Sequence, residues 1–418
     1  MKKIAFARRR AARTVTAASV AILALLATGC GSVMSGSGIA GEIDVRELDA
    51  GTYPILPVDF TGEYAPTYDL GRELAAILLA EHLVLGPEID EKLAEGYWMT
   101  IKRPNVATSV SEQVRPVLET NRMIYGFGSS STDQRQFSSL ALSAGDHTLA
   151  DLQRELEPTY FGVTVFQFPG ADAASRAATE LEQADFDVAP DLNQKVQLDK
   201  YANAHAHWRP GVASMLTTVA TGSYVINLQV GVPKPELPEL IALTEKVLDA
   251  QIPRLERLTP KSPEEVLRLS NDPDQILRRV LNPDQFNSPS AEHYATYGLQ
   301  GYVHTHRDHA SRRAAYEQAG VDRIGIVWGS QIFRARDAEA AETLRTTVLD
   351  WPGTQPAEAP PSAVPSAQCV ENEGADFYTK RFSCAVQYRR YVTVVHAHQI
   401  GDAHQRAAAA YGVMANSQ

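Results

Sequence analysis

The chain has 418 residues, a formal net charge of −11 and 44% hydrophobic residues, which is the composition of a folded acidic protein. The acidic balance argues against nucleic acid as a partner, because nucleic-acid binding needs a basic surface. It also argues against broad adsorption to anionic lipid headgroups. The length suits two domains after an N-terminal segment, and we place them at 44–256 and 257–418.

Residues 1–29 are typical of a secretory signal peptide. Residues 1–13 carry six basic and no acidic side chains, and residues 15–27 form an apolar run. That run is shorter than the roughly 20 residues needed to cross a bilayer, and it suits the apolar region of a signal peptide. We therefore expect export, and removal of this segment takes the net charge from −11 to −17.

The end of this segment, Ala27-Thr28-Gly29-Cys30, resembles the processing site of bacterial lipoproteins. In that family the cysteine thiol receives a diacylglycerol and the preceding peptide bond is cut, although leucine is usual where Ala27 stands. The resemblance implies that Cys30 is lipidated and that the chain is anchored to the extracytoplasmic face of the cell membrane. The alternative is an ordinary secretory signal that is cut elsewhere. Residues 30–43, rich in Gly and Ser, are then the flexible tether.

If Cys30 is lipidated, Cys369 and Cys384 remain as an even pair. An even pair in an exported chain favours a disulfide. A metal pair and a redox couple are the alternatives, but both use closer spacing than these two cysteines have.

Secondary structure follows from hydrophobic periodicity and turn residues along the chain. Apolar residues at helical spacing predict a helix over 68–85. Short strands are expected at 99–108 and 123–128, and helices at 148–156, 262 onward, 274–281 and 309–319. The segments 44–57 and 352–367 are rich in turn residues and are expected to be an extended opening segment and an exposed loop.

A repeat is predicted between residues 158–253 and 322–418. Each copy reads as a strand, an Ala-rich helix, a β-hairpin and a final helix. The expected strands are 161–168 and 324–333, the Ala-rich helices 171–184 and 337–349, the hairpins 212–232 and 382–397, and the final helices 237–250 and 402–414. This order predicts an α+β fold of two similar units, each a mostly antiparallel sheet with helices packed on one face. Chance similarity of two α+β segments is the alternative.

The lipoprotein-like site, the opening segment 44–57, two Phe-x3-Asp-Ala junctions and the ending at 389–414 together resemble an uncharacterised lipoprotein family. It is a domain of unknown function found in actinobacteria that contain mycolic acids. The second half is also similar in style to extracellular sensor domains of mycobacterial receptor kinases. These resemblances imply a cell-envelope location and no particular reaction.

Histidine is the main candidate for chemistry. His304, His306 and His309 fall within six residues and are candidate metal ligands, since imidazole binds zinc and copper. Against a metal site, no fixed ligand pattern such as HExxH is present, and a polar loop leading into a helix is the alternative. Two further His-Ala-His sets, at 205–207 and 396–398, are expected to place both imidazoles on one face of a strand.

No catalytic residue and no cofactor is assigned, because the chain lacks Gly-x-Ser-x-Gly, Gly-x-Gly-x-x-Gly and the phosphate-binding Gly-Lys-Ser/Thr motif. The leading hypothesis is a non-enzymatic binding or scaffolding lipoprotein of the envelope. Its ligand would be a small molecule, a lipid or an envelope protein. The alternatives are an envelope hydrolase with an unrecognised site and a histidine-based metal-binding protein.

Overall fold

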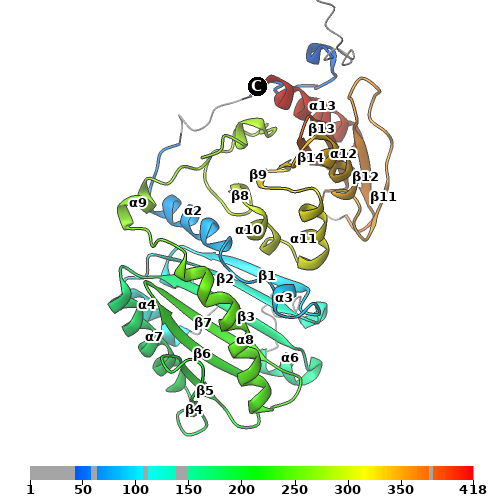
Figure 1. The fold of residues 1–418 in the computed structure, drawn as a ribbon. Helices are drawn as coiled ribbons and strands as arrows, with labels where there is room; N and C mark the ends of the chain where they lie inside the picture. The colour runs from blue at the N-terminus through cyan, green and yellow to red at the C-terminus, as the bar shows by residue number, and fades with distance from the viewer. Residues whose placement is uncertain (1–42, 58–63, 107–111, 138–148, 376–379, 418) are drawn as a thin grey trace, which may run out of the picture. The chain divides into compact units, whose positions relative to one another are not determined.

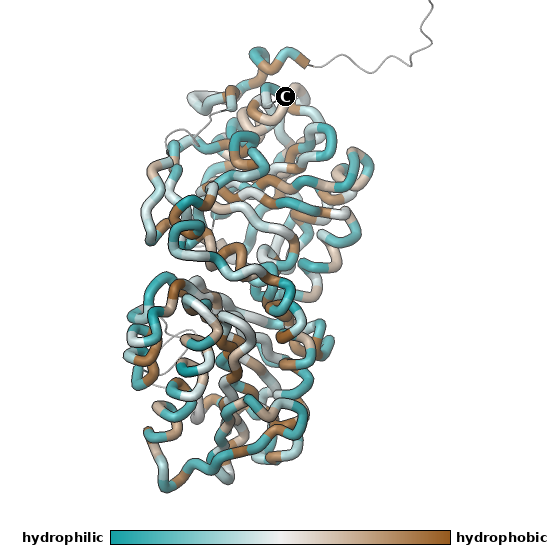
Figure 2. Tube along the Cα trace, turned by 60° about the vertical axis from the view of Figure 1, so that its left-hand side comes forward, coloured by the Kyte–Doolittle hydropathy of each residue, from teal (hydrophilic) through white to brown (hydrophobic). Residues whose placement is uncertain are grey.

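The computed structural model describes residues 43–57, 64–106, 112–137, 149–375 and 380–417. The signal segment, Cys30 and the tether therefore lie outside the described residues. Residues 45–418 form one unit, which contains two antiparallel sheets of seven strands each (Figure 1). Hydrophobic and hydrophilic stretches alternate along the trace, as burial of one side of each element requires (Figure 2).

The first sheet has the strand order β1-β2-β3-β7-β6-β5-β4, and every neighbouring pair is antiparallel. Its strands are β1 (Glu95–Ile101), β2 (Tyr125–Thr132), β3 (Tyr160–Gln167), β4 (Gln194–Val196), β5 (His205–Trp208), β6 (Ser214–Thr221) and β7 (Tyr224–Gly231).

The second sheet has the order β11-β12-β13-β14-β10-β9-β8, again antiparallel throughout. Its strands are β8 (Tyr294–Tyr297), β9 (Arg323–Val327), β10 (Ser330–Arg334), β11 (Thr354–Pro356), β12 (Gln368–Asn372), β13 (Phe382–Tyr388) and β14 (Tyr391–Ala397). Read from the β8 edge, this order is that of the first sheet with seven added to each strand number. The α+β class and the two similar units are therefore confirmed.

The helices follow their sequence signals closely. The α-helices are α2 (Tyr68–Ala80), α3 (Gly86–Ile89), α4 (Arg115–Thr120), α6 (Leu149–Leu156), α7 (Ala171–Phe186), α8 (Leu237–Glu256), α9 (Pro263–Leu267), α10 (Leu299–His304), α11 (His309–Gln318), α12 (Ala338–Thr347) and α13 (Ile400–Asn416). Short 3-10 helices occupy Val45–Glu47, Pro104–Val106, Glu112–Val114 and Leu277–Arg279. Polar N-caps explain several starts: Ser262 and Glu265 form a capping box at α9, and Asp337 accepts from the Ala340 N–H at α12.

Helices cover both faces of each sheet, which differs from the one-sided packing that the sequence predicted. In the first sheet, Val225 packs with the alanines of α7, whereas its neighbour Ile226 packs with α8. In the second sheet, Val392 packs with α12, whereas the Thr393 hydroxyl lies 3.2 Å from the Met414 sulfur on α13. Successive strand residues point to opposite faces, so both faces of these strands are apolar and both are covered by helices.

Three local expectations were also wrong. The segment predicted as one strand at 324–333 is the hairpin β9–β10, which turns at Gly329 with a φ of 73°. That left-handed conformation suits glycine. The strand expected at 123–128 runs on through the serines at 129–131, which lie within β2. The segment 274–281 contains only the 3-10 turn at 277–279.

The opening segment lies against the last helix of the chain. The Tyr53 hydroxyl bonds to Asp402, and the Arg406 guanidinium lies 4.9 Å from the centre of the Tyr53 ring. The Asn416 amide donates to the Ile55 carbonyl at 2.9 Å. Residues 45–57 are therefore fixed to α13 by side-chain contacts. Among the described residues, no helix is long and apolar enough to cross a membrane.

Candidate functional site

The three clustered histidines do not form one ligand set. His304 is fully buried, with Nδ1 2.8 Å from the Ser129 hydroxyl and Nε2 3.3 Å from the Leu83 carbonyl. Both ring nitrogens are thus used by the protein, and burial lowers the pKa of His304 to about 3. Within the described ranges, no group of three or more His, Cys, Asp or Glu side chains has the arrangement needed to hold a metal ion.

His309 is also fully buried, and neither ring nitrogen has a hydrogen bond of good geometry to a described residue. The carbonyls of His304 and His306 lie near its ring, although burial still lowers the pKa of His309 to about 4. Its ring fills the space beside Gly96, where an added Cβ would lie 2.0 Å from the imidazole. We therefore assign His309 to packing.

The histidines of β5 lie in a different setting. His207 is buried, with Nδ1 3.0 Å from a Glu182 oxygen and Nε2 3.4 Å from an Asp185 oxygen. Burial lowers the pKa of His207, but the two carboxylates outweigh it and raise the pKa above its ordinary value. His205 makes a 3.1 Å contact with Thr179. These contacts use His205 and His207 within the first sheet and its helix α7.

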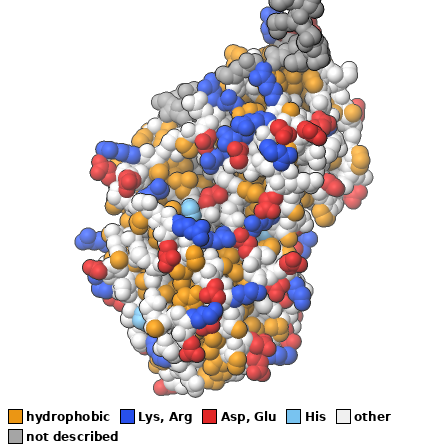
Figure 3. Space-filling view, in the orientation of Figure 1, with side chains coloured by type: hydrophobic (Ala, Val, Ile, Leu, Met, Phe, Trp, Pro, Cys, Tyr) orange, Lys and Arg blue, Asp and Glu red, His pale blue; other side chains and the backbone are white. Residues whose placement is uncertain are grey.

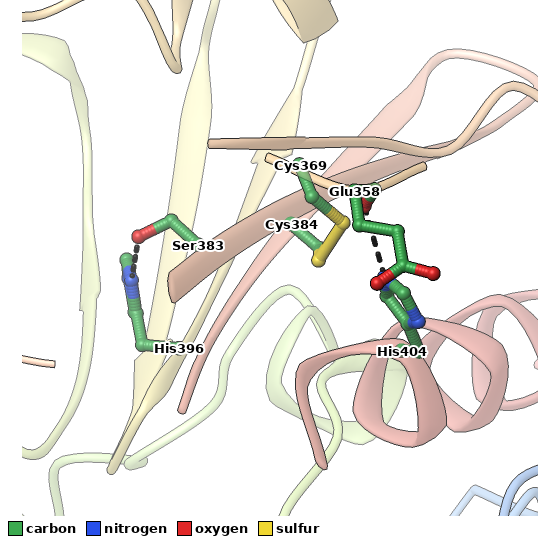
Figure 4. The surroundings of a disulfide bond; sticks show 6 residues. All are labelled: Glu358, Cys369, Ser383, Cys384, His396 and His404. Carbon is green, nitrogen blue, oxygen red and sulfur yellow. Dashed lines mark hydrogen bonds between the residues drawn. A yellow bond between two sulfur atoms is a disulfide. The ribbon is translucent and has the colours of Figure 1, made fainter. Parts of the chain in front are cut away.

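The final His-Ala-His set is split by the end of a strand. His396 lies in β14 and is part-buried, whereas His398 follows the strand and is exposed. The expectation that both point to one strand face was therefore wrong. The Nδ1 of His396 lies 2.8 Å from the hydroxyl of Ser383 on β13, and the two side chains point toward each other (Figure 4).

The disulfide expected from the sequence is present in the same sheet. Cys369 and Cys384 face each other in the β12–β13 pairing and are bonded (Figure 4). Val370 and Ser383, the neighbours of the two cysteines, both line a cavity. Neighbouring strand residues point to opposite faces, so the disulfide joins these strands from the face that does not bear the cavity.

This cavity brings together several polar and ionisable side chains of the described structure. It has a volume of about 170 Å³ and combines one cationic group, two imidazoles and several hydroxyls with aliphatic walls. Its polar and aromatic lining residues are His306, Arg312, Tyr316, Gln331, Trp351, Thr354, Ser383 and His396. They come from α11, β10, β11, β13, β14 and the segments that follow α10 and α12. It is smaller than the roughly 300–1,000 Å³ typical of sites for drug-sized ligands.

Arg312 is the cation of this cavity. Its guanidinium lies over the Trp351 ring, and it makes no ion pair or hydrogen bond to a carboxylate among the described residues. Burial lowers the pKa of Arg312, while the Tyr316 side chain and Asp308 act in the opposite direction. The buried Tyr316 hydroxyl has no hydrogen bond of good geometry to a described residue. The Arg312 side chain is half-buried, so it loses part of its hydration and gains no carboxylate partner in exchange, which suits an anion in the cavity.

The two histidines of the cavity are neutral at neutral pH. Burial lowers the pKa of His306 to about 3 and that of His396 to about 4. The Nδ1 of His306 lies 3.1 Å from both the Tyr302 carbonyl and the Thr305 hydroxyl. The carbonyl can only accept a hydrogen bond, and the Thr305 hydroxyl donates its own proton to that carbonyl at 2.7 Å, so neither donates to Nδ1. This Nδ1 therefore carries the proton, and Nε2 is left as an acceptor.

The first sheet lacks this constellation, although it repeats the fold. The register that pairs Ser383 with His396 pairs Leu216 with Gln229 in the equivalent hairpin β6–β7. Side chains at these equivalent positions thus differ in chemistry, although the two hairpins have the same backbone pairing. Basic and acidic side chains are intermixed on the face shown in Figure 3.

Sequence reasoning named His306 and His396 but placed them in separate groups. It missed Arg312, Trp351 and Ser383, because no local motif marks them and they meet only through the sheet. The one sequence signal that points to Arg312 is its position next to the histidine cluster at 304–309. Arg307 has the same signal but does not line the cavity.

Comparison with known proteins places the chain in a family. No curated protein matches it significantly. One similar solved structure is the extracellular domain of PknH from Mycobacterium tuberculosis, which is 12% identical. The match covers 44% of this chain and 96% of that one with a TM-score of 0.25, so it carries no argument about function. Residues 62–271 match the N-terminal part, and residues 276–417 the C-terminal part, of a domain of unknown function named DUF7373, and the chain belongs to that family.

Proposed function

We propose that this chain is a lipid-anchored envelope protein that binds a small anionic ligand, without catalysis, in the cavity of its second sheet. The observation that carries the proposal is Arg312, a cation at the wall of the cavity that has no carboxylate partner among the described residues. An anionic ligand would supply the missing counter-charge. Guanidinium groups bind carboxylate and phosphate through paired, charge-assisted hydrogen bonds.

The rest of the cavity supports small-molecule binding over scaffolding. Trp351 holds the guanidinium by stacking, and Tyr316, Ser383 and Thr354 bring hydroxyls to the same space. Aliphatic side chains complete the wall: Val348, Leu349, Val370 and Val394. Binding sites of this kind combine an apolar lining with a few polar groups that fix the ligand's orientation.

The test is titration calorimetry on the full chain, purified in detergent, with inorganic phosphate, cyclohexanecarboxylate and D-glucuronate as probes. We expect at least one probe to bind and Arg312→Gln to weaken it by about ten- to a hundredfold, the range for loss of a hydrogen bond to a charged group. Arg268→Gln is the matched control, since Arg268 is exposed and already paired with Glu264. Absence of binding by all three probes and by D-glucose 6-phosphate, or equal binding by the Arg312→Gln protein, would overturn the proposal.

The anchor is proposed from the sequence alone, on the resemblance at Cys30. Two or three acyl chains bind a membrane firmly, because each buried methylene contributes roughly 0.8 kcal/mol. Cys30→Ser should therefore move the protein from the membrane fraction to the soluble fraction of exporting cells. Cys369→Ser, which removes a disulfide-bonded cysteine, serves as the control for loss of a cysteine elsewhere, and an unchanged membrane fraction for Cys30→Ser would refute lipidation.

A further inference from the structure

We infer that the ligand of this cavity is a polyhydroxylated anion, such as a sugar acid or a sugar phosphate, in which a hydroxyl donates to His306 while the anionic group binds Arg312. The inference rests on the proposed function and narrows it. Both residues line the same cavity of about 170 Å³, so one small molecule can contact both.

The hydroxyl follows from the tautomer of His306. Its Nδ1 proton is directed to the Tyr302 carbonyl, so Nε2 offers a lone pair and no proton. Nε2 accepts no hydrogen bond from a described residue, and as an unprotonated acceptor it cannot bond to a carboxylate oxygen. A hydroxyl group is the small-molecule donor that satisfies this acceptor. A ligand that complements the cavity therefore has an anionic group at Arg312 and a hydrogen-bond donor at His306.

A neighbouring cleft gives room for the remaining hydroxyls. It has a volume of about 330 Å³ and shares Leu349, Thr354 and Val370 with the cavity. Its polar lining is mostly neutral and consists of hydroxyls and amides: Thr346, Thr347, Thr354, Gln355 and Gln368. Asp350 is the one charged residue there, and it disfavours a second anionic group. The two hollows together favour a ligand with one anionic end and an uncharged polar body.

The experiment compares four probes by titration calorimetry on the full chain in detergent. D-glucuronate and D-glucose 6-phosphate carry both a negative charge and hydroxyls, cyclohexanecarboxylate carries only the charge, and D-glucose carries only the hydroxyls. We expect at least one of the first two to bind at least about tenfold more tightly than either of the others. The first two probes also distinguish a carboxylate from a phosphate end.

His306→Phe is the matching variant, because the phenyl ring can keep the edge-to-face contact with Tyr302, whose ring centre lies 4.6 Å away. This variant should lower the affinity for the hydroxylated anion by about tenfold and leave the affinity for cyclohexanecarboxylate unchanged. Equal binding of cyclohexanecarboxylate and the hydroxylated anions overturns the inference but not the proposed function. Unchanged affinity of a folded His306→Phe protein for the hydroxylated anion also overturns the inference but not the proposed function. Failure of all anions to bind overturns both.

Discussion

The hydroxyl of Ser383 and the Nδ1 of His396 lie 2.8 Å apart, on residues that face each other across β13 and β14. A serine beside a histidine is the core of many hydrolase sites, but such sites also need a basic imidazole oriented by a third group. Burial lowers the pKa of His396 to about 4, and the nearby charges of Arg406 and Lys380 lower it further. This imidazole is therefore a weak base, and the pair is better suited to holding the cavity wall.

Ser383→Ala tests the structural role of this pair. It leaves His396 Nδ1 without its partner, and we expect a loss of about 1 kcal/mol in the free energy of unfolding, measured by denaturant titration. Ser175→Ala, on the exposed side of α7, should change stability by less than about 0.5 kcal/mol. Equal stability of the two variants would show that the Ser383–His396 contact contributes nothing measurable.

Serine-directed chemistry tests the hydrolase alternative on the same residue. Because His396 is a weak base, we expect Ser383 to resist diisopropyl fluorophosphate at neutral pH. Peptide mass mapping after treatment measures the modification, and a commercial serine protease in the same tube is the positive control. Stoichiometric phosphorylation of Ser383 would contradict the non-catalytic proposal and favour an envelope hydrolase.

Removal of the disulfide tests how far the cavity depends on the β12–β13 pairing. The bond spans 15 residues, and chain-entropy arguments give about 3 kcal/mol for a loop of that length. The Cys369→Ser/Cys384→Ser protein should lose about that much free energy of unfolding and should bind the anionic probe less tightly, since Val370 and Ser383 adjoin the cysteines. A reducing agent should affect the wild-type protein alone, and equal sensitivity of both proteins would point to another cause.

The repeat could be predicted because residues close together in the sequence form the patterns that mark its strands and helices. Tyr224-Val225 and Tyr391-Val392 begin equivalent strands, and alternation of apolar residues marks both hairpins. The hairpin at Gly329 was missed because only two residues separate β9 from β10 and both strands carry apolar residues. A short segment with apolar residues on both sides of a turn can read as one strand, because its pattern does not mark the turn.

The cavity could not be predicted in the same way. Arg312 is far along the chain from Ser383 and His396, which face each other in the β13–β14 hairpin, and it joins them only when α11 packs over the second sheet. The sequence shows that histidines are present, but burial decides which of them are neutral and which are paired. His207 and His304 have the same side chain and opposite pKa shifts. Burial lowers the pKa of both, but only His207 lies beside two carboxylates, which outweigh burial there.

His207 predicts a stability difference that grows toward acid pH. Its pKa is raised in the folded state, where burial opposes but the Asp185 and Glu182 carboxylates dominate. The stabilisation is fully present below the unfolded pKa of about 6.5 and is lost as pH rises through the folded pKa. His207→Gln should therefore cost more stability at pH 5.5 than at pH 9, measured by urea unfolding. His205→Gln on the same strand is the control, and a pH-independent cost for His207→Gln would contradict the ion pair.

His304 predicts the opposite dependence. Burial lowers its folded pKa to about 3, and the charge of Arg254 and the ring of His309 act in the same direction, whereas Glu88 and the Leu83 carbonyl oppose them. The stabilisation is present above the unfolded pKa of about 6.5 and is lost as pH falls toward the folded value, at up to about 1.4 kcal/mol per pH unit.

Replacing His304 by Gln, which keeps polar groups near Ser129 and Leu83 but cannot titrate, should flatten the fall in unfolding free energy between pH 6 and pH 4. The expected change in slope is close to one proton. His398→Gln is the matched control, because it removes an exposed imidazole just after β14. Other buried groups titrate in the same range, so the comparison of slopes, rather than the wild-type slope itself, isolates His304. Identical slopes for wild type and His304→Gln would mean that this imidazole is not held neutral by the fold.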